Sequence, residues 1–461
     1  MTADLPMIEG VIAWAALPFL VVALVGCAYL AAAAHLVGRF GRRRPARPGA
    51  EPPVTLVKPL CGAEPLLFEN LASFCDQDYG GAVQIVFGVQ NPADPAIDVV
   101  HRLQAAHPDR DITLVIETTP HGANRKVANL INMEPYIRHP VVVLADSDMR
   151  VGPDYLTRIV AELRQPGVGV VTCLYHGVTH GGVWSRLSGL MIEAYFLPSV
   201  VVGVALGLAK PCFGSTIALR RDTLDEIGGF RAFADGLADD YAIGEAVRRL
   251  GLRAVIPPFT VGHLCPEASA AELWRHELRW ARTIRAVDPA GHYGAAITHP
   301  LAFALIGLGL GGGAPCLAAA CLAIACRMSL SARVEQAFGL TPRQHLLMPL
   351  RDLVSFAVYV RSLFGGAVTW KGHDYRVRAD GTLITSPRSP LHDALPLPAS
   401  ALVRRFRRRR RLPLPGPARD QVVLVSDLAR PAGGAGRGLE ADRRPPAPHG
   451  AGRGRRAGEG L

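Results

Sequence analysis

The sequence lacks the cysteine patterns of a disulfide-stabilised or zinc-binding protein. Its nine cysteines are scattered and odd in number, and no two of them form a CxxC pair. Neither a disulfide framework nor a zinc site is therefore indicated. A catalytic domain that faces a reducing cytosol is the simplest interpretation. The chain also lacks an internal repeat, so a solenoid is not expected.

Charge is missing from two long stretches, residues 11–36 and 301–326. The first is long enough to cross about 30 Å of hydrocarbon. Acidic residues precede it and an arginine cluster follows it, the reverse of a cleavable signal peptide. The positive-inside rule places the arginine flank in the cytoplasm and therefore predicts a retained anchor with the bulk of the protein in the cytosol. A buried core helix is the alternative. The expected location is the inner membrane, as a multi-pass protein with a cytosolic catalytic domain. Glycines and a proline interrupt the second stretch, which is either one long span or two short ones.

Two further apolar segments contain charged residues. Residues 183–208 are interrupted by Arg186, Glu193 and Pro198. They are expected to form an interfacial helix near the membrane rather than a span, with a core helix as the alternative. Residues 345–364 suit either a span with a polar face or a surface helix.

The net charge of +11 comes largely from the C-terminal part of the chain. Seven arginines lie between Arg404 and Arg411, and Pro, Gly, Ala and Arg dominate from about Pro387. Such composition predicts disorder. The arginine block could bind anionic lipid or RNA, but no nucleic-acid partner is expected. The predicted organisation is an anchor at 1–48, a catalytic domain at 49–295, membrane segments at 296–366, a motif segment at 367–400 and a disordered tail at 401–461.

Residues 50–295 predict an α/β domain with a mostly parallel sheet. Expected strands and helices alternate at 54–57 (strand), 66–74 (helix), 83–89 (strand), 96–106 (helix), 112–116 (strand) and 141–144 (strand). Ligands of such sheets bind beyond the carboxyl ends of the strands. The run Asp146-Ser147-Asp148 directly follows the last of these strands.

Alternate carboxylates after a strand can offer oxygen ligands to Mg2+ or Mn2+. Such a cation would bridge the two phosphates of a sugar nucleotide. Two aspartates separated by one residue are common in proteins. As the alternative to a metal site, Asp146 and Asp148 could form part of a turn or cap a helix. His263 is a candidate further ligand, although a core histidine is the more ordinary interpretation.

Three other segments carry candidate chemistry. Asp239-Asp240 precedes an expected helix at 241–249, so these carboxylates either cap it or supply a general base. The expected helix at 273–285 has four arginines at three- and four-residue spacing, which suits phosphate binding or a solvated face. Asn124-Arg125-Lys126 is expected in a polar loop, where it contacts phosphate or base or is merely exposed.

Taken together, the motifs resemble those of ceramide glucosyltransferases, and within that group most closely the bacterial hopanoid-associated glycosyltransferases. The resemblance covers roughly residues 50–385 and implies a membrane-bound, inverting enzyme with a GT-A (nucleotide-diphospho-sugar transferase) domain and transmembrane helices at both ends. The motifs that carry it are VQNPADPAID (89–98), GANRKVANL (122–130), LADSDMRV (144–151), LADDYAIG (237–244), HELRWARTIR (276–285) and WKGHDYRVRADGT (370–382).

The resemblance also implies roles for the acidic residues. Asp146 and Asp148 match the metal and diphosphate motif, which calls for Mg2+ or Mn2+ as cofactor. Asp240 matches the catalytic base, and Asp239 replaces the glutamate that usually precedes it.

The remaining matched residues are expected near the donor. Arg279 and Trp280 match an Arg-Trp signature, with His276 where Gln or Arg is usual. Lys126 matches a lysine near the nucleotide. Asn91 stands where an aspartate is common, so contact with uridine there is neutral or comes from Asp94.

The implied partners are a UDP-sugar donor and a membrane lipid acceptor. The leading pair is UDP-N-acetylglucosamine with a hopanoid polyol such as bacteriohopanetetrol, and the alternative is UDP-glucose with ceramide. Two alternative functions from other classes are a nucleotidyltransferase that makes sugar nucleotides and a non-catalytic protein that binds membrane or nucleic acid. The first would normally carry a Gly-rich, Arg-containing loop near the first strand, and residues 56–64 contain only Gly62.

Overall fold

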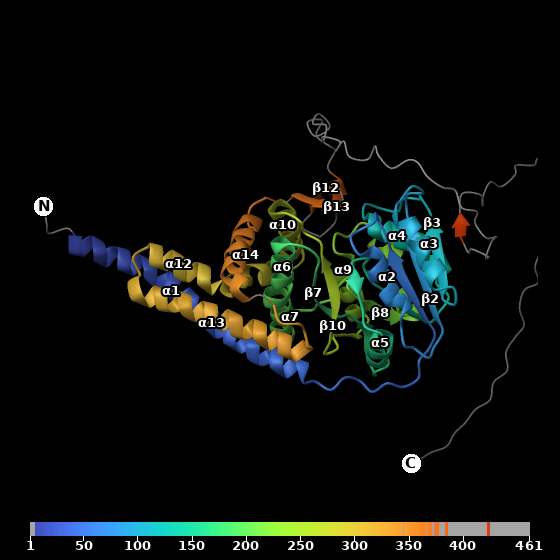
Figure 1. Ribbon diagram of the computed structural model, residues 1–461, viewed down its shortest axis with the longest axis horizontal. Helices are drawn as coiled ribbons and strands as arrows, with labels where there is room; N and C mark the ends of the chain where they lie inside the picture. Colours follow the sequence, from blue (N-terminus) through green and yellow to red (C-terminus); the bar gives the residue numbers. More distant parts are fainter. Residues whose placement is uncertain are drawn as a thin grey trace, which may run out of the picture. The chain divides into compact units, whose positions relative to one another are not determined.

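The computed structural model describes residues 5–343 and 345–365, together with short strands at 367–370, 373–377, 383–385 and 422–424. Side chains are described from residue 14 to 343 and from 345 to 365. Figure 1 shows the sheet-containing region beside a group of long helices.

The main sheet is mixed and mostly parallel, as predicted. Seven of its eight strands run in one direction, and β8 runs against both of its neighbours, β4 and β6. The strands and helices predicted between residues 54 and 144 are confirmed to within two residues. The strand order is β14 (Val422–Leu424), β3 (Asp111–Ile116), β2 (Val83–Val89), β1 (Val54–Pro59), β4 (Val141–Leu144), β8 (Ile217–Arg220), β6 (Val168–Val171) and β9 (Arg253–Val255).

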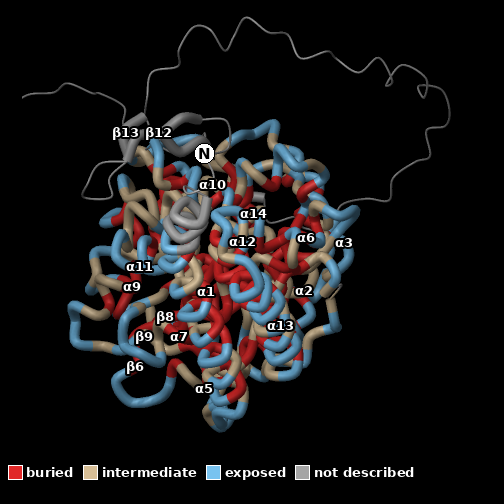
Figure 2. Tube along the Cα trace, turned by 90° about the vertical axis from the view of Figure 1, so that its left-hand side faces the viewer, coloured by how far each residue is buried: buried red, intermediate tan, exposed pale blue. Residues whose placement is uncertain are grey.

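Two hydrophobic cores cover the two faces of this sheet. Figure 2 shows that the buried stretches of the chain lie in the interior and the exposed stretches at the periphery. Successive side chains of a strand point to opposite faces, so Leu56 packs into one core and Val57 into the other. Each of the central strands is buried on both faces, which explains its continuous run of apolar residues. The helices that contribute to these cores are α2 (Leu67–Cys75), α3 (Ala96–Ala106) and α5 (Tyr155–Leu163) on one face, and α4 (Arg125–Met133), α8 (Arg221–Glu226) and α9 (Asp239–Arg249) on the other.

A second, three-stranded sheet adjoins the carboxyl end of β4. It consists of β5 (Met149–Arg150), β10 (Thr260–Cys265) and β7 (Leu174–Thr179). The antiparallel register of β5 and β10 sets His263 opposite Met149. This pairing brings a histidine from late in the chain next to the acidic motif that follows β4.

The two uncharged stretches form apolar helices that pack together. The first is α1 (Leu5–Gly41), which contacts both α12 (Pro300–Gly309) and α13 (Gly313–Phe338). The second stretch is therefore two helices, because the chain turns at Gly311 and Gly313, both with positive φ. By length and hydropathy, residues 14–41 and 313–338 are each able to cross a membrane. The predicted association with membrane is supported by these helices.

The segment at 183–208 is a helix with a π-helical turn. It comprises α6 (Val183–Met191), the π turn Ile192–Phe196 and α7 (Leu197–Ala205). It too has the length and hydropathy of a span, but 67% of its most apolar window is buried in the protein. Burial of this extent favours a helix that packs against its own chain.

Helices α10 (Ala270–Val287) and α14 (Met348–Ser362) are joined by a buried ion pair. Arg351 of α14 binds the carboxylate of Glu277 through both terminal nitrogens, each at 2.7 Å. A short helix, α11 (Pro289–Gly294), follows α10. The bidentate geometry fixes the orientation of α10, and α10 contributes four residues to the site described below.

The C-terminal motif segment forms a small antiparallel sheet of β11 (Ala367–Trp370), β12 (His373–Val377) and β13 (Leu383–Thr385). Its side chains lie outside the described residues. Most of the tail predicted to be disordered also lies outside them. One part of it differs from the expectation, because Val422–Leu424 form β14 beside β3. Its apolar, partly β-branched residues suit the otherwise open edge of the sheet.

Replacing Arg351 by Met should strongly destabilise the protein. The change leaves Glu277 buried without its partner, which typically costs about 3–5 kcal/mol. Denaturant unfolding in detergent micelles measures this loss. The double variant Arg351→Met/Glu277→Leu should recover most of it, and a double variant as unstable as Arg351→Met would contradict a role for the pair.

Candidate active site

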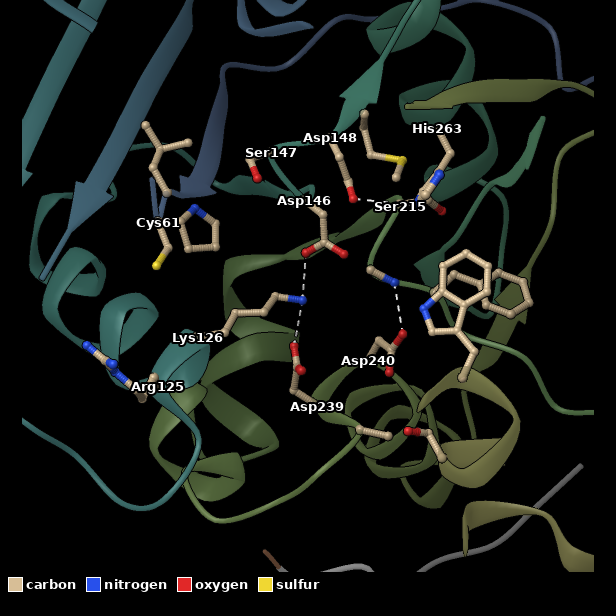
Figure 3. A pocket seen from close by; sticks show the side chains of 18 of the residues that line it. Cys61, Arg125, Lys126, Asp146, Ser147, Asp148, Ser215, Asp239, Asp240 and His263 are labelled. Atoms are coloured by element: carbon tan, nitrogen blue, oxygen red, sulfur yellow. Dashed lines mark hydrogen bonds and ion pairs between the residues drawn. The ribbon is translucent and has the colours of Figure 1, made fainter. Parts of the chain in front are cut away.

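A cavity of about 320 Å3 opens at the carboxyl ends of β1 and β4. Its wall is made by the residues after these strands, the N-terminal parts of α4 and α9, the segment 213–215 that precedes β8, strands β7 and β10, and one face of α10. This is where ligands of open parallel sheets are expected. Figure 3 shows acidic and basic side chains from several of these elements pointing toward one another.

Asp146 and Asp148 are held in place by backbone contacts around the end of β4. The Asp146 amide donates to the Gly214 carbonyl at 3.0 Å, and the Lys58 ammonium donates to the Asp146 carbonyl at 2.8 Å. Ser147 donates instead to Glu64 at 3.1 Å. The two aspartates therefore line the cavity from a rigid turn.

The carboxylate of Asp148 is half-buried in the wall. One carboxylate oxygen is 3.4 Å from His263 Nε2, and the other is buried without a hydrogen-bond partner among the described residues. Burial, followed by the charges of Asp146 and Glu64, raises the pKa of Asp148 to about 8. Burial also lowers the pKa of His263 to about 3, so this ring is neutral and can accept through one nitrogen.

Lys126 lies between two carboxylates from different elements (Figure 3). Its ammonium is 2.7 Å from Asp146 Oδ1 and 3.0 Å from Asp239 Oδ2. Burial lowers the pKa of Lys126, but Asp146 and Asp239 outweigh that effect and raise it well above its usual value. Lys126 is therefore a fixed positive charge inside the cavity.

The loop expected around Asn124 is instead the start of helix α4. The Asn124 side chain caps this helix by accepting from the amides of Lys126 and Val127 at 3.0 and 3.2 Å. Asparagine is a favoured residue at this position because its oxygen satisfies free amides of the first turn. The cap places Lys126 in the first turn, where its side chain reaches the carboxylates.

Asp239 and Asp240 begin α9, and they have different environments. Asp239 is buried against Lys126, whereas Asp240 accepts from the Gly214 amide at 3.0 Å and the Tyr241 amide at 2.8 Å. Burial and the charge of Asp239 raise the pKa of Asp240 to about 6, against the lowering effect of Lys126. Of the two, Asp240 is the carboxylate poised to accept a proton near neutral pH.

Gly214 meets both acidic motifs. Its carbonyl accepts from Asp146 and its amide donates to Asp240. A side chain at this position would collide with the Asp146 carboxylate. The absence of a Cβ atom therefore allows the two acidic segments to share one wall.

Helix α10 contributes His276, Arg279, Trp280 and Thr283 to the cavity wall. His276 Nδ1 lies 2.5 Å from the carboxylate of buried Glu267, which orients the ring. Trp280 packs edge-on against His276 and His263, with ring centroids 4.4 and 5.4 Å away. Burial lowers the pKa of Arg279 despite the nearby Asp148 and Asp146.

The other three arginines of this helix do not form the phosphate-binding face that their spacing suggested. Arg275 donates to the Ala271 carbonyl of its own helix, and Arg282 donates to the carbonyl of Phe364. Arg285 donates to the Gly365 carbonyl. Of the four, the cavity wall includes Arg279.

Asn91 and Asp94 lie outside the residues that line the cavity, which include their neighbour Gln90. Both Asp94 oxygens accept from the Gly62 amide at 3.0 Å, and one also accepts from Ala96 at the start of α3. Asn91 accepts from the Ala93 amide. In this structure both residues order the loop after β2, and their predicted contact with the nucleotide stays a prediction.

Sequence reasoning missed two buried residues at the site: Tyr175, which lines the cavity, and Lys58, which lies behind the wall and donates to the Asp146 carbonyl. The Lys58 ammonium lies 3.5 Å from the centroid of the Phe74 ring, and burial lowers its pKa to about 7. A lysine at the end of the apolar run Val54–Val57 was the available signal. No signal in the sequence identifies Tyr175, because this residue reaches the site only through the pairing of β7 with β10.

Asp146, Asp148 and His263 suit a divalent cation by their chemistry, since oxygen and imidazole ligands bind Mn2+ and related ions. The buried Asp148 oxygen without a hydrogen-bond donor is an atom that a cation would satisfy. Within the residues that the structure describes, however, no group of three such side chains is already gathered as a metal site. The residues present fit a cation that completes its shell with ligand oxygens.

Comparison with known proteins identifies the family. The sequence pattern of the family described as glycosyl transferase family 21 matches residues 18–383, which is most of the chain. The chain belongs to glycosyl transferase family 21. It is therefore a glycosyltransferase, as the motifs predicted, and not an enzyme that synthesises sugar nucleotides.

Similar proteins are found at low sequence identity. Ceramide glucosyltransferase 1 of Caenorhabditis elegans is 24% identical over 352 residues, 73% of this chain and 74% of that protein. An N-acetylglucosaminyltransferase of Bradyrhizobium diazoefficiens is 24% identical over 243 residues, 50% of this chain and 49% of that protein. A mannosyltransferase from Pyrobaculum calidifontis, solved with GDP-Man and Mn2+, is 22% identical with a TM-score of 0.44, covering 75% of this chain and 99% of that chain.

Replacing Asp148 by Ala should weaken Mn2+-dependent binding of UDP, because a ligand oxygen is lost. Calorimetry with and without Mn2+ measures this, and excess Mn2+ should restore part of the affinity. Ser147→Ala is the matched control, since its hydroxyl faces Glu64. UDP affinity that is insensitive to EDTA in the unmodified protein would contradict a metal at this site.

Proposed function

We propose that this family 21 glycosyltransferase moves a sugar from a UDP-sugar to a membrane-lipid hydroxyl with inversion at the anomeric carbon. The observation that carries the proposal is the separation of two acidic groups by one lysine. Asp146 and Asp148 lie on one side of Lys126, and Asp239 and Asp240 lie on the other (Figure 3). A diphosphate site and a proton acceptor are thus adjacent and distinct.

The transfer is a single displacement. The acceptor oxygen forms a bond to the anomeric carbon, the bond from that carbon to the diphosphate oxygen breaks, and the hydroxyl proton passes to Asp240. Asp146 and Asp148 would hold Mg2+ or Mn2+, which offsets charge on the diphosphate. Arg279 and Lys126 supply fixed positive charge to the departing UDP, and His276 donates a further hydrogen bond when protonated.

The first candidate pair is UDP-N-acetylglucosamine with a hopanoid polyol such as bacteriohopanetetrol. The second is UDP-glucose with ceramide, and the similarity to a ceramide glucosyltransferase over 73% of the chain favours it. Mass spectrometry of the lipids formed from each pair distinguishes them. Release of UDP that requires added lipid tests sugar transfer itself.

We also propose an orientation in which the catalytic domain is cytosolic at the inner membrane. Arg39, Arg42, Arg43, Arg44 and Arg47 lie at or just beyond the end of α1. The positive-inside rule retains this flank in the cytoplasm. Nucleotide sugars are soluble substrates, and this orientation gives them access to the cavity.

Asp240→Asn should reduce turnover by at least about 10²-fold, the usual contribution of a general base. UDP binding should persist, because the amide is nearly isosteric. Asp239→Asn is the matched control, and it should perturb UDP binding through Lys126. Near-normal kcat in Asp240→Asn would assign the proton to another group.

The pH profile should report Asp240 directly. kcat/KM should be low when Asp240 is protonated and should rise to a plateau above its pKa of about 6. Lys126 lowers that pKa, so Lys126→Gln should move the rising limb to higher pH. A midpoint that is unchanged in Lys126→Gln, or a flat profile down to acidic pH, would contradict the assignment.

A further inference from the structure

Helix α14 buries two charged side chains on its inner face and presents apolar side chains on its outer face. Arg351 and Asp352 are almost fully buried, at 0% and 2% exposure. An outward row of apolar residues on α14 consists of Leu350 (47% exposed), Leu353 (41%) and Val360 (37%), whose spacing of three and seven residues places them on one helix face. Leu346 (92%), in the short helical turn before α14, and Phe364 (63%), just after α14, extend this row at both ends, and the five residues are called here the α14 stripe.

The buried face of α14 is satisfied by protein. Arg351 pairs with Glu277 of α10 and also donates to the Leu187 carbonyl of α6 at 3.2 Å. Asp352 pairs with Arg327 of α13 at 3.1 Å and accepts from the Tyr195 hydroxyl. Charged groups this deeply buried are stable only when paired. The inner face is therefore fixed, and the stripe cannot turn inward.

Three observations identify a lipid bilayer as the partner of the α14 stripe. First, a helix of 15 residues is about 22 Å long at about 1.5 Å per residue, too short to cross about 30 Å of hydrocarbon. Second, α14 contacts α12 and α13 and runs across the direction of α13 (Figure 1). Third, these two helices also present exposed leucines, namely Leu305, Leu310, Leu317 and Leu322.

Basic side chains gather at the C-terminal end of the stripe. Arg282 and Arg361 donate to the Phe364 carbonyl, and Arg285 donates to the Gly365 carbonyl. Arginine beside an apolar helix face suits the anionic headgroup layer, because the side chain keeps its charge in the polar region while its stem contacts apolar surface. A soluble protein partner would not require this combination.

We propose that α14 lies in the plane of the membrane, with the α14 stripe in the bilayer and the Glu277–Arg351 pair holding α10 against it. Helix α10 carries His276, Arg279 and Trp280. The cavity is thereby kept at the headgroup level, where a lipid hydroxyl is presented. This inference extends the proposed function by naming the surface that sets the depth of the cavity.

Spin labels on the full chain in phosphatidylcholine–phosphatidylglycerol vesicles test the proposal. Exposed Cys61 and Cys321 are replaced by Ser, and single cysteines are introduced as Leu346→Cys, Leu353→Cys and Val360→Cys. Relative access of oxygen and of a water-soluble nickel chelate reports depth. Leu322→Cys on α13 is the lipid-facing control, and exposed Ala105→Cys on α3 is the water-facing control.

The three stripe labels should favour oxygen over nickel, as Leu322→Cys does, and should report similar depths. Labels that behave like Ala105→Cys would overturn the proposal, and so would labels shielded from both reagents, which indicate a protein partner. A steady depth gradient along α14 would show that it crosses the membrane instead. This readout needs no sugar transfer, so it is independent of whether the proposed reaction occurs.

Discussion

The arrangement of the cavity depends on one buried lysine between opposing carboxylates. Lys126 contacts Asp146 after β4 and Asp239 at the start of α9, two segments that are distant in sequence. Without a cation between them, buried carboxylates so close together would repel one another and take up protons. The same positive charge keeps the pKa of Asp240 low enough to be ionised near neutral pH. Placement and protonation of the acidic groups thus have a common cause.

The helices around the cavity extend this electrostatic organisation toward the membrane. Arg327 on α13, Asp352 and Arg351 on α14, and Glu277 on α10 form successive buried pairs. Each pair is costly to break on one side only, because the remaining charge has no access to water. Apolar packing alone would allow these helices to slide, whereas charge pairing specifies their register. The position of Arg279 and Trp280 therefore depends on helices that form no part of the cavity wall.

Much of the fold was predictable because its signals are local. The strands at 83–89 and 141–144 are short apolar runs between polar segments, and their limits agree with those of β2 and β4. The acidic motif was found because it directly follows such a strand. The division between α12 and α13 was left open, since glycine interrupts some helices and is tolerated in others.

The site was less predictable where tertiary contacts decide it. His263 and Tyr175 meet the acidic motif only because β10 pairs with both β5 and β7. The arginines at 275, 282 and 285 share a helix with Arg279, but their hydrogen bonds lie elsewhere. Asn124 was assigned to a loop, because its capping role depends on where the helix begins. Pairing across long sequence separation leaves no periodic pattern to detect.

The most direct test of sugar transfer with inversion is the anomeric configuration of the product. Purified protein in lipid vesicles would be supplied with an α-linked UDP-sugar and each candidate lipid, and the glycolipid would be examined by NMR. A single displacement at the anomeric carbon predicts a β-linked sugar on the lipid hydroxyl. An α-linked product, or release of free sugar with no glycolipid formed from any lipid, would contradict the account.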